Sequence, residues 1–120
     1  MADQQQIINH SIVAEAKELM GDRFPMMIKY FIEDTETYML EINAGIANNN
    51  AEQALGPAHT IKSSAKQLGA ERVSEIARQI EALCREIIDN NSNDYTKMAS
   101  LYQALKKEIE TAAPELNKLC

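Results

Sequence analysis

The sequence predicts an all-α fold, an up-down-up-down four-helix bundle with an additional helix at its N-terminal end. Apolar residues recur at spacings of three and four along most of the chain, which is typical of amphipathic helices. Strand-like alternation is missing, and the 120 residues include only 4 glycines. Short polar turns separate the periodic segments, which favours antiparallel packing of consecutive helices. Residues 1–120 are therefore expected to form a single domain.

The N-terminal region is predicted to contain one short helix. Residues 1–6 are polar, and we expect them to be disordered. A helix follows over residues 7–20, and Ser11 either caps it or lies inside it. Gly21 is expected to end this helix, with Asp22 as the N-cap of the next one. The inward stripe of the short helix consists of Ile8, Ile12, Ala16 and Leu19.

The second predicted helix ends at about Ala47 and holds Pro25 in its first turn, where a missing N–H costs little. Met26 and Leu40 fall opposite its apolar stripe. They either pack beneath the N-terminal helix or stay exposed as a docking surface. Three consecutive asparagines then form a turn, and the last of them, Asn50, is a suitable N-cap.

The third helix is predicted over residues 51–68, with Gly69 in the position that ends it. Pro57 is unusual there, because an interior proline removes a hydrogen bond and crowds a carbonyl, at a cost of roughly 3 kcal/mol. Two outcomes are open. Either the helix kinks at Pro57, or residues 51–56 form a separate turn and Pro57 opens the helix. The apolar stripe of this helix consists of Ala54, Ala58, Ile61, Ala65 and Leu68.

Two further helices complete the predicted bundle. The fourth covers residues 71–89, and the fifth begins at residue 94 or 95 after a polar loop. Pro114 is expected to interrupt the end of the fifth helix, with room for one more turn after it. The inward residues are Val73, Ile76, Ala77, Ile80, Leu83, Cys84 and Ile87 in the fourth helix and Met98, Leu101, Tyr102, Leu105, Ile109 and Ala112 in the fifth.

The composition narrows the possible functions. A formal net charge of −6 argues against a nucleic-acid partner, which requires a basic surface. No apolar run approaches the roughly 18 residues that span a bilayer, and the first residues do not resemble a signal peptide, so we expect a cytoplasmic protein without a membrane partner. Cys84 and Cys120 have neither metal-site spacing nor a disulfide framework, and Cys84 is expected to be a buried free thiol.

The sequence around His59 presents this histidine to a partner. On a helix that turns roughly 100° per residue, His59 points about 130° away from the apolar stripe. Gly56 and Ser63 lie one turn before and after it, while Lys62 and Lys66 place two ammonium groups nearby. An exposed imidazole between small residues and close to cations suits a histidine that another protein approaches and on which it leaves an anion.

The stretch of residues 58–70 reads Ala-His-Thr-Ile-Lys-Ser-Ser-Ala-Lys-Gln-Leu-Gly-Ala. It resembles the signature of histidine-containing phosphotransfer (HPt) domains, roughly Ala-His-x-Leu-Lys-Gly-Ser/Ala-Ala-x-x-Leu-Gly-Ala. His59 matches the phosphoacceptor of that family, and Lys62 matches its lysine. Ser63 stands where the family usually has glycine, but serine is small enough to keep close docking. Similarity extends to Leu19-Met20-Gly21-Asp22 and Phe31 upstream and to Ala77, Ile80 and Glu81 downstream.

The resemblance implies a phosphocarrier of a multistep phosphorelay and not an enzyme. A receiver domain of a hybrid histidine kinase would pass phosphate from its phospho-aspartate to Nε2 of His59, and a response regulator would receive it from there. Lys62, one turn further along the helix, is the candidate for stabilising the phosphate. The chain has no ATP-binding motif, so autophosphorylation is not expected. We expect no cofactor or metal site of its own, Mg²⁺ supplied by the receiver domain, and a monomer.

Five further positions have two interpretations each. Some family members place a polar side chain at the position of Glu81 and a cation at that of Arg85, near the histidine. Glu81 would then orient the imidazole through its Nδ1–H, whereas the alternative is a surface salt-bridge ladder that contributes little. Gly56, Ser63 and Lys66 are expected to form a docking surface, or else they are ordinary small and solvated helix residues.

Two other functions stay open on the sequence. One is a helical adaptor of the same fold that docks receiver domains without phosphotransfer, although the presence of both His59 and Lys62 argues against it. The other is the phosphoacceptor domain of a chemotaxis-type kinase, phosphorylated by an attached catalytic domain. The end of the given chain at residue 120 disfavours that function, and a longer gene product would favour it.

Overall fold

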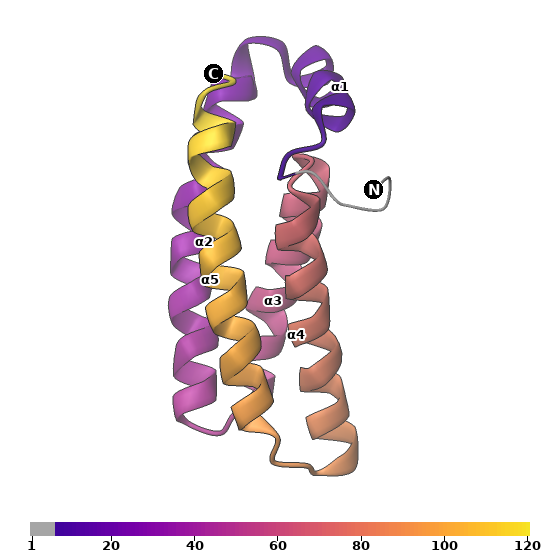
Figure 1. Ribbon diagram of the computed structural model, residues 1–120, viewed down its shortest axis with the longest axis vertical. Coiled ribbons are helices and arrows are strands. Elements are labelled where there is room, and N and C mark those ends of the chain that lie inside the picture. Colours follow the sequence, from indigo (N-terminus) through magenta and orange to yellow (C-terminus); the bar gives the residue numbers. More distant parts are fainter. Residues whose placement is uncertain (1–6) are drawn as a thin grey trace.

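The computed structural model describes residues 7–120, so residues 1–6 and their expected disorder lie outside the described residues. Figure 1 shows a bundle in which consecutive helices run in alternating directions, with a short helix at the end where the first long helix begins. The all-α four-helix bundle with an additional N-terminal helix is thus confirmed. The elements are α1 (His10–Met20), a 3₁₀ turn η1 (Gly21–Arg23), α2 (Phe24–Ala47), α3 (Ala51–Gln67), α4 (Glu71–Asn90) and α5 (Tyr95–Asn117).

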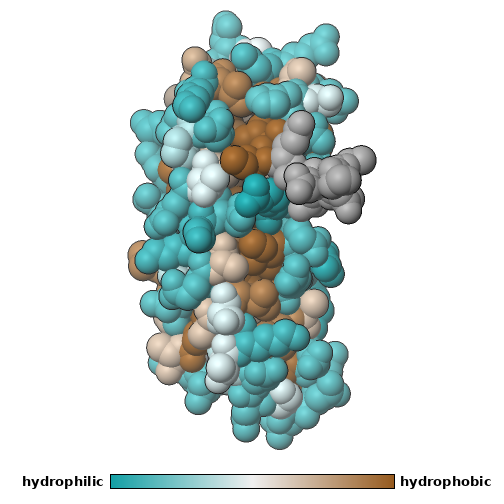
Figure 2. Space-filling view, in the orientation of Figure 1, coloured by the Kyte–Doolittle hydropathy of each residue, from teal (hydrophilic) through white to brown (hydrophobic). Residues whose placement is uncertain are grey.

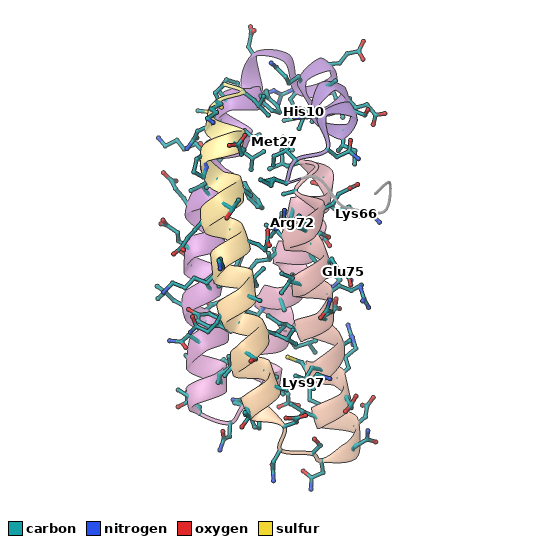
Figure 3. The ribbon with its side chains drawn as sticks, in the orientation of Figure 1. His10, Met27, Lys66, Arg72, Glu75 and Lys97 are labelled. Carbon is teal, nitrogen blue, oxygen red and sulfur yellow. The ribbon has the colours of Figure 1, made fainter. Side chains whose placement is uncertain are left out.

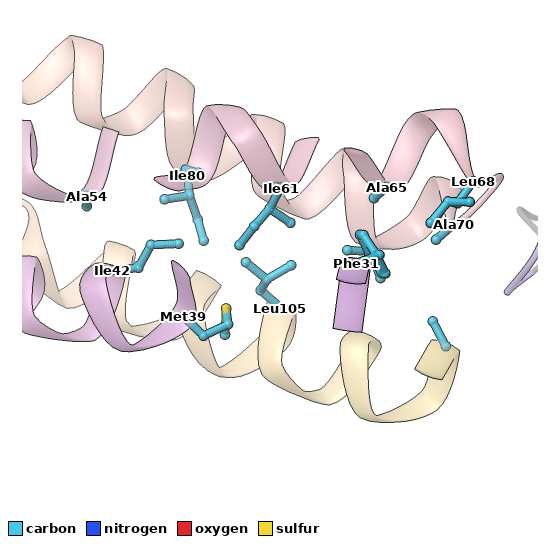
Figure 4. Close-up of a cluster of buried hydrophobic side chains, with 14 of the residues drawn as sticks. Phe31, Met39, Ile42, Ala54, Ile61, Ala65, Leu68, Ala70, Ile80 and Leu105 are labelled. Carbon is cyan, nitrogen blue, oxygen red and sulfur yellow. The ribbon is translucent and has the colours of Figure 1, made fainter. Parts of the chain in front are cut away.

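The core lies between the four long helices. Figure 4 shows Ile42, Ile61, Ile80 and Leu105, one from each long helix, pointing toward one another. All four are fully buried, and burying a side chain of this size stabilises a fold by roughly 1.5–3 kcal/mol. Helix α3 contributes mostly small side chains to the interior, which allows its neighbours to approach closely. The fully buried alanines of α3 are Ala54, Ala58 and Ala65.

Helix α1 begins at His10 and not at residue 7 as predicted. Asn9 is its N-cap, because the side-chain oxygen of Asn9 accepts hydrogen bonds from the N–H groups of Ser11 and Ile12 at 3.1 and 3.4 Å. Ser11 therefore lies inside the helix. The face that α1 turns inward also differs from the predicted stripe: Val13 is buried, whereas Leu19 is 83% exposed.

The connection from α1 to α2 differs from the prediction as well. Asp22 lies within the 3₁₀ turn and does not cap α2, whose N-cap is Arg23 without a side-chain hydrogen bond. Pro25 occupies the first turn of α2, as predicted. Met26 and Leu40 are 53% and 70% exposed, so they do not pack beneath α1.

Helix α3 runs without interruption through Pro57, so residues 51–56 are not a separate turn. Its first turn is held from two sides. The side chain of Asn50 accepts a backbone N–H of that turn at 3.2 Å, and the hydroxyl of Tyr95 accepts the N–H of Ala51 at 3.1 Å. These bonds stabilise the short part of the helix before Pro57. That part has one main-chain hydrogen bond fewer, because proline has no N–H to donate to the carbonyl four residues earlier.

Helix α5 also continues through a proline. Pro114 was expected to interrupt it, but the helix extends to Asn117. Ala112 and Leu116 are buried on either side of Pro114, and this burial holds the last turn in place. The side chain of Asp94 caps the other end by accepting the N–H of Lys97 at 3.3 Å.

Gly69 ends α3 and also accommodates the segment before α1. The N–H groups of Gly69 and Ala70 donate to the carbonyls of Lys66 and Ala65 at 3.2 and 2.9 Å, which is a Schellman motif with Gly69 at φ +78°. A β-carbon at Gly69 would lie 2.7 Å from the carbonyl oxygen of Asn9. The N–H of Asn9 donates to the carbonyl of Gly69 at 2.7 Å, so the two backbones touch.

On the face shown in Figure 2, hydrophobic residues follow the middle of the bundle and hydrophilic residues flank them. Within residues 7–120, none of the helices has the length and apolar character needed to span a membrane. Cys84 is buried and free, as predicted, and burial raises the pKa of its thiol to about 11, so the thiol stays protonated near neutral pH.

The surroundings of Gly69 and Gly56 predict different effects of an alanine substitution on stability. Gly69→Ala should lower the free energy of unfolding by about 1–3 kcal/mol, because it strains the left-handed backbone and collides with Asn9. Gly56→Ala is the control, since a β-carbon there meets no atom of the described chain within 4 Å apart from its own turn of helix. It should leave stability unchanged or raise it by up to about 1 kcal/mol. Urea unfolding measures both, and equal losses of stability would contradict the assignment.

Candidate functional site

His59 lies in the middle of α3 on the side that faces away from the core. Its neighbours Ala58 and Ile61 are fully buried, whereas the His59 side chain is 55% exposed. The helical spacing predicted this direction. The core therefore fixes the backbone of this turn, and the ring stays open to a partner.

The ring of His59 is oriented by a carboxylate from the next helix. Nδ1 of His59 lies 2.9 Å from Oε2 of Glu81, whose side chain is only 7% exposed. An ionised carboxylate can only accept hydrogen bonds, so Nδ1 carries the proton and donates it. In the neutral ring Nε2 is then the nitrogen with the free lone pair. Among the described residues, Nε2 of His59 has no hydrogen-bond partner.

The buried carboxylate of Glu81 is the centre of an ion cluster whose cations are partly exposed. Oε1 of Glu81 lies 2.7 Å from Nζ of Lys62, and Oε2 lies 2.9 Å from Nη2 of Arg85 as well as near His59. Burial raises the pKa of Glu81, but the hydrogen bonds from Lys62, Arg85 and His59 outweigh it and lower the pKa from 4.5 to about 2. The carboxylate is therefore ionised near neutral pH. Two cations and one anion leave a net positive charge beside the ring.

The two cations of the cluster differ in position. Lys62 belongs to α3 and is 30% exposed, whereas Arg85 belongs to α4 and is 59% exposed. Within residues 7–120, Arg85 donates to Glu81 at 2.9 Å and is not hydrogen-bonded to the ring of His59. The ammonium of Lys62 is engaged by Glu81 but has three donors, so it can bind a second acceptor without leaving the carboxylate. Their roles toward a phosphate stay predictions.

The surface on both sides of His59 lacks bulk. Gly56 and Ser63 are exposed, one turn before and one turn after the ring. Within residues 7–120 nothing requires glycine at position 56, because a β-carbon there would meet no atom beyond its own turn of helix within 4 Å. Lys66 lies at the surface near the end of α3 (Figure 3). A groove of about 530 Å³ between α3 and α4 is lined by Lys62, Ser63, Lys66, Glu71, Ser74, Glu75 and Arg78.

One contact of this region was missed by the sequence reasoning. Ser74 of α4 is buried, and its hydroxyl donates a hydrogen bond to the main-chain carbonyl of Lys62 at 2.8 Å. The signal was present, because Ser74 occupies an inward position on the same helical face as Glu81. A serine there looks like an ordinary small residue until the packing of α3 on α4 is known.

The described residues contain no candidate metal site. Within residues 7–120, no group of three or more His, Cys, Asp or Glu side chains could hold a metal ion.

The cluster predicts an acid-sensitive contribution to stability. The pKa of Glu81 is lower in the folded chain than the ordinary value of 4.5, so its ionised form stabilises the fold above that pH. This contribution is lost as the pH falls from about 4.5 toward 2. Glu81→Gln keeps the size of the side chain but not its charge, and it should lower the free energy of unfolding at pH 7 by roughly 1–3 kcal/mol.

Urea unfolding at pH 7 and pH 3 measures this effect. The difference between wild type and Glu81→Gln should shrink at pH 3, because the wild type has then lost part of the same contribution. Glu41→Gln, at an exposed position of α2, is the control and should change stability by no more than about 0.5 kcal/mol at either pH. A difference for Glu81→Gln that stays constant or grows at pH 3 would contradict the cluster.

Comparison with known proteins agrees with this architecture. The crystal structure of histidine-containing phosphotransfer protein B (HptB) from Pseudomonas aeruginosa PAO1 has the same fold, with a TM-score of 0.85 over 96% of this chain and 95% of that chain at 16% sequence identity. The curated proteins contain no match to the sequence. The family model described as "Hpt domain" matches residues 26–115. The chain therefore belongs to the Hpt domain family, the histidine-containing phosphotransfer domains that serve as intermediates of phosphorelays.

Proposed function

We propose that His59 is the phosphoacceptor of a multistep phosphorelay. It takes a phosphoryl group from the phospho-aspartate of a receiver domain in a hybrid sensor kinase and passes it to the aspartate of a response regulator. One observation carries the proposal: the exposed ring of His59 is held at Nδ1 by the buried carboxylate of Glu81, which leaves Nε2 as the free nucleophile. In this proposal the donor and the acceptor of the phosphoryl group are both receiver domains, and ATP has no direct part.

The transfer step needs no separate base. The lone pair of Nε2 attacks the phosphorus, the Nε2–P bond forms, and the bond from phosphorus to the acyl oxygen breaks, so that the receiver aspartate leaves as a carboxylate. The proton stays on Nδ1 throughout, where it donates to Glu81. The ring becomes positively charged, and the nearby carboxylate stabilises that charge. The return step to another aspartate follows the same path in reverse, which suits a carrier.

Lys62 and Arg85 bind different anions in this proposal. Lys62 donates to the phosphoryl oxygens, because it lies one turn from His59 and retains free donors beside Glu81. Arg85 stays on the carboxylate and contributes to its pairing while Lys62 also binds the phosphate. The chain has no cofactor of its own in this scheme, and Mg²⁺ comes from the receiver domain.

The docking surface consists of Gly56, Ser63 and Lys66. The reacting atoms must approach to about 3–3.5 Å, so a receiver has to sit directly on the turn that carries His59. Gly56 and Ser63 leave room for that approach, and Lys66 offers its charge to acidic side chains of the receiver. Expectations of a monomer and of a cytoplasmic location are part of the same proposal.

The proposal predicts that His59 is the site of phosphorylation. A panel of receiver domains, each radiolabelled on its aspartate, is mixed with the wild type and with His59→Gln. Label should move to the wild type alone, and its bond should be labile to acid but stable to alkali, as expected for phosphohistidine. Glutamine keeps polarity and approximate size but has no nucleophilic nitrogen, so the fold should survive the change.

Other outcomes would redirect the function. Receiver binding without transfer, from any member of the panel, would favour a docking adaptor. Transfer to both proteins would place the phosphate on another residue. His10→Gln is the matched control, because His10 is exposed on α1 and has no part in the proposed site, and it should accept label at the wild-type rate.

Because position 56 has no side chain, adding one there should weaken receiver docking without disturbing the fold. Gly56→Leu should fold normally, since position 56 is an exposed helix position with open space around it. Its bulk should raise the KM for a phosphorylated receiver by about tenfold or more, because the receiver cannot approach Nε2 as closely. Ala104→Leu adds a comparable bulk at an exposed position of α5 and should leave KM unchanged. Equal KM values for both variants would remove Gly56 from the docking surface.

A further inference from the structure

Ser74 makes a hydrogen bond that the helices do not need for their own integrity. Its hydroxyl donates to the main-chain carbonyl of Lys62 at 2.8 Å, and the residue is only 8% exposed. Position 62 lies inside α3, where each carbonyl already accepts the N–H four residues later. A carbonyl oxygen has two lone pairs, so the bond from Ser74 is an additional link between α4 and α3.

Ser74 and Glu81 bind the same turn of α3. They are seven positions apart on α4, about two helical turns, and therefore lie on the same face. Ser74 bonds to the main chain of Lys62, and Glu81 bonds to the side chains of His59 and Lys62. The turn that carries the reactive ring is thus attached to α4 at two points.

The two attachments differ in what they can fix. Glu81 and Lys62 meet through long side chains, which can follow a small slip of one helix along the other. The hydroxyl of Ser74 is bonded directly to its β-carbon and binds a main-chain atom, so a slip or rotation of α3 breaks it. Ser74 therefore controls the position of the backbone, and Glu81 acts on the ring from the position that results.

We infer that Ser74 is a positioning residue for phosphotransfer: it fixes the turn of His59 against α4 so that Nδ1 of His59 stays within hydrogen-bond distance of Glu81. The inference rests on the proposed function and adds a residue to it. Without Ser74 the ring would meet Glu81 for a smaller fraction of the time, and the proton would spend more time on Nε2. A ring protonated at Nε2 cannot attack phosphorus.

The test uses Ser74→Ala in the full chain. Nitrogen-15 NMR of His59 reports which ring nitrogen holds the proton, and the two ring resonances should move toward each other in Ser74→Ala. With a phosphorylated receiver that serves the wild type, the maximal rate of transfer should fall about tenfold while KM is unchanged. Ser74→Thr keeps the hydroxyl and should restore both the NMR signature and the rate.

Two controls make the result decisive. Thr111→Val removes a hydroxyl that donates to the carbonyl of Lys107 at 3.0 Å within α5, and it should change neither the ring resonances nor the rate. Thermal unfolding accompanies each variant. If Ser74→Ala does not fold at the temperature of measurement, Ser74→Cys replaces it, because cysteine fills similar space with only a weak donor.

The outcomes distinguish a failure of this inference from a failure of the proposed function. Ring resonances and transfer rates of Ser74→Ala that equal those of the wild type would overturn the role of Ser74 and leave the phosphocarrier intact. Failure of the wild type to accept phosphate from any receiver would overturn the proposed function. The NMR comparison still decides in that case whether Ser74 positions the ring on Glu81.

Discussion

The hydrogen bonds and ion pairs of the buried Glu81 carboxylate are the interactions on which the functional site depends. A charge in this environment is costly unless it is paired and fully hydrogen-bonded. Two of its three partners, His59 and Lys62, come from α3, and the third, Arg85, comes from its own helix. The orientation of the reactive ring therefore depends on how α3 packs on α4. A change that separates these helices disturbs the chemistry even when the core stays buried.

Helix α3 serves the core and the partner with opposite faces, and both faces are built from small residues. Inside, alanines allow α3 to lie close to its neighbours, and the resulting short distance lets side chains of α3 and α4 share one carboxylate. Outside, Gly56 and Ser63 leave the ring of His59 accessible. The glycines of this region illustrate the difference. Gly69 is required by its own backbone and by the contact with Asn9, whereas Gly56 has no such requirement within the chain.

Much of the fold could be predicted because helical periodicity is a local property. The end of α2, the bounds of α3 and α4 to within one residue, and the cap by Asn50 follow from residues that are close in the sequence. The errors arose where distant contacts decide. Asn9 begins α1 because the adjacent backbone is held by Gly69, and Pro114 stays within its helix because flanking side chains are buried by the bundle.

By itself the sequence determined the all-α class, the outward direction of His59 and the family signature, because rotation along one helix places residues a few positions apart without reference to anything else. Only the tertiary structure decided that Glu81 binds His59, Lys62 and Arg85 together and that Ser74 holds the main chain of the same turn. These partners lie on different helices. Their meeting depends on how far one helix slides along and rotates against the next, and side-chain packing over the whole interface sets those two quantities.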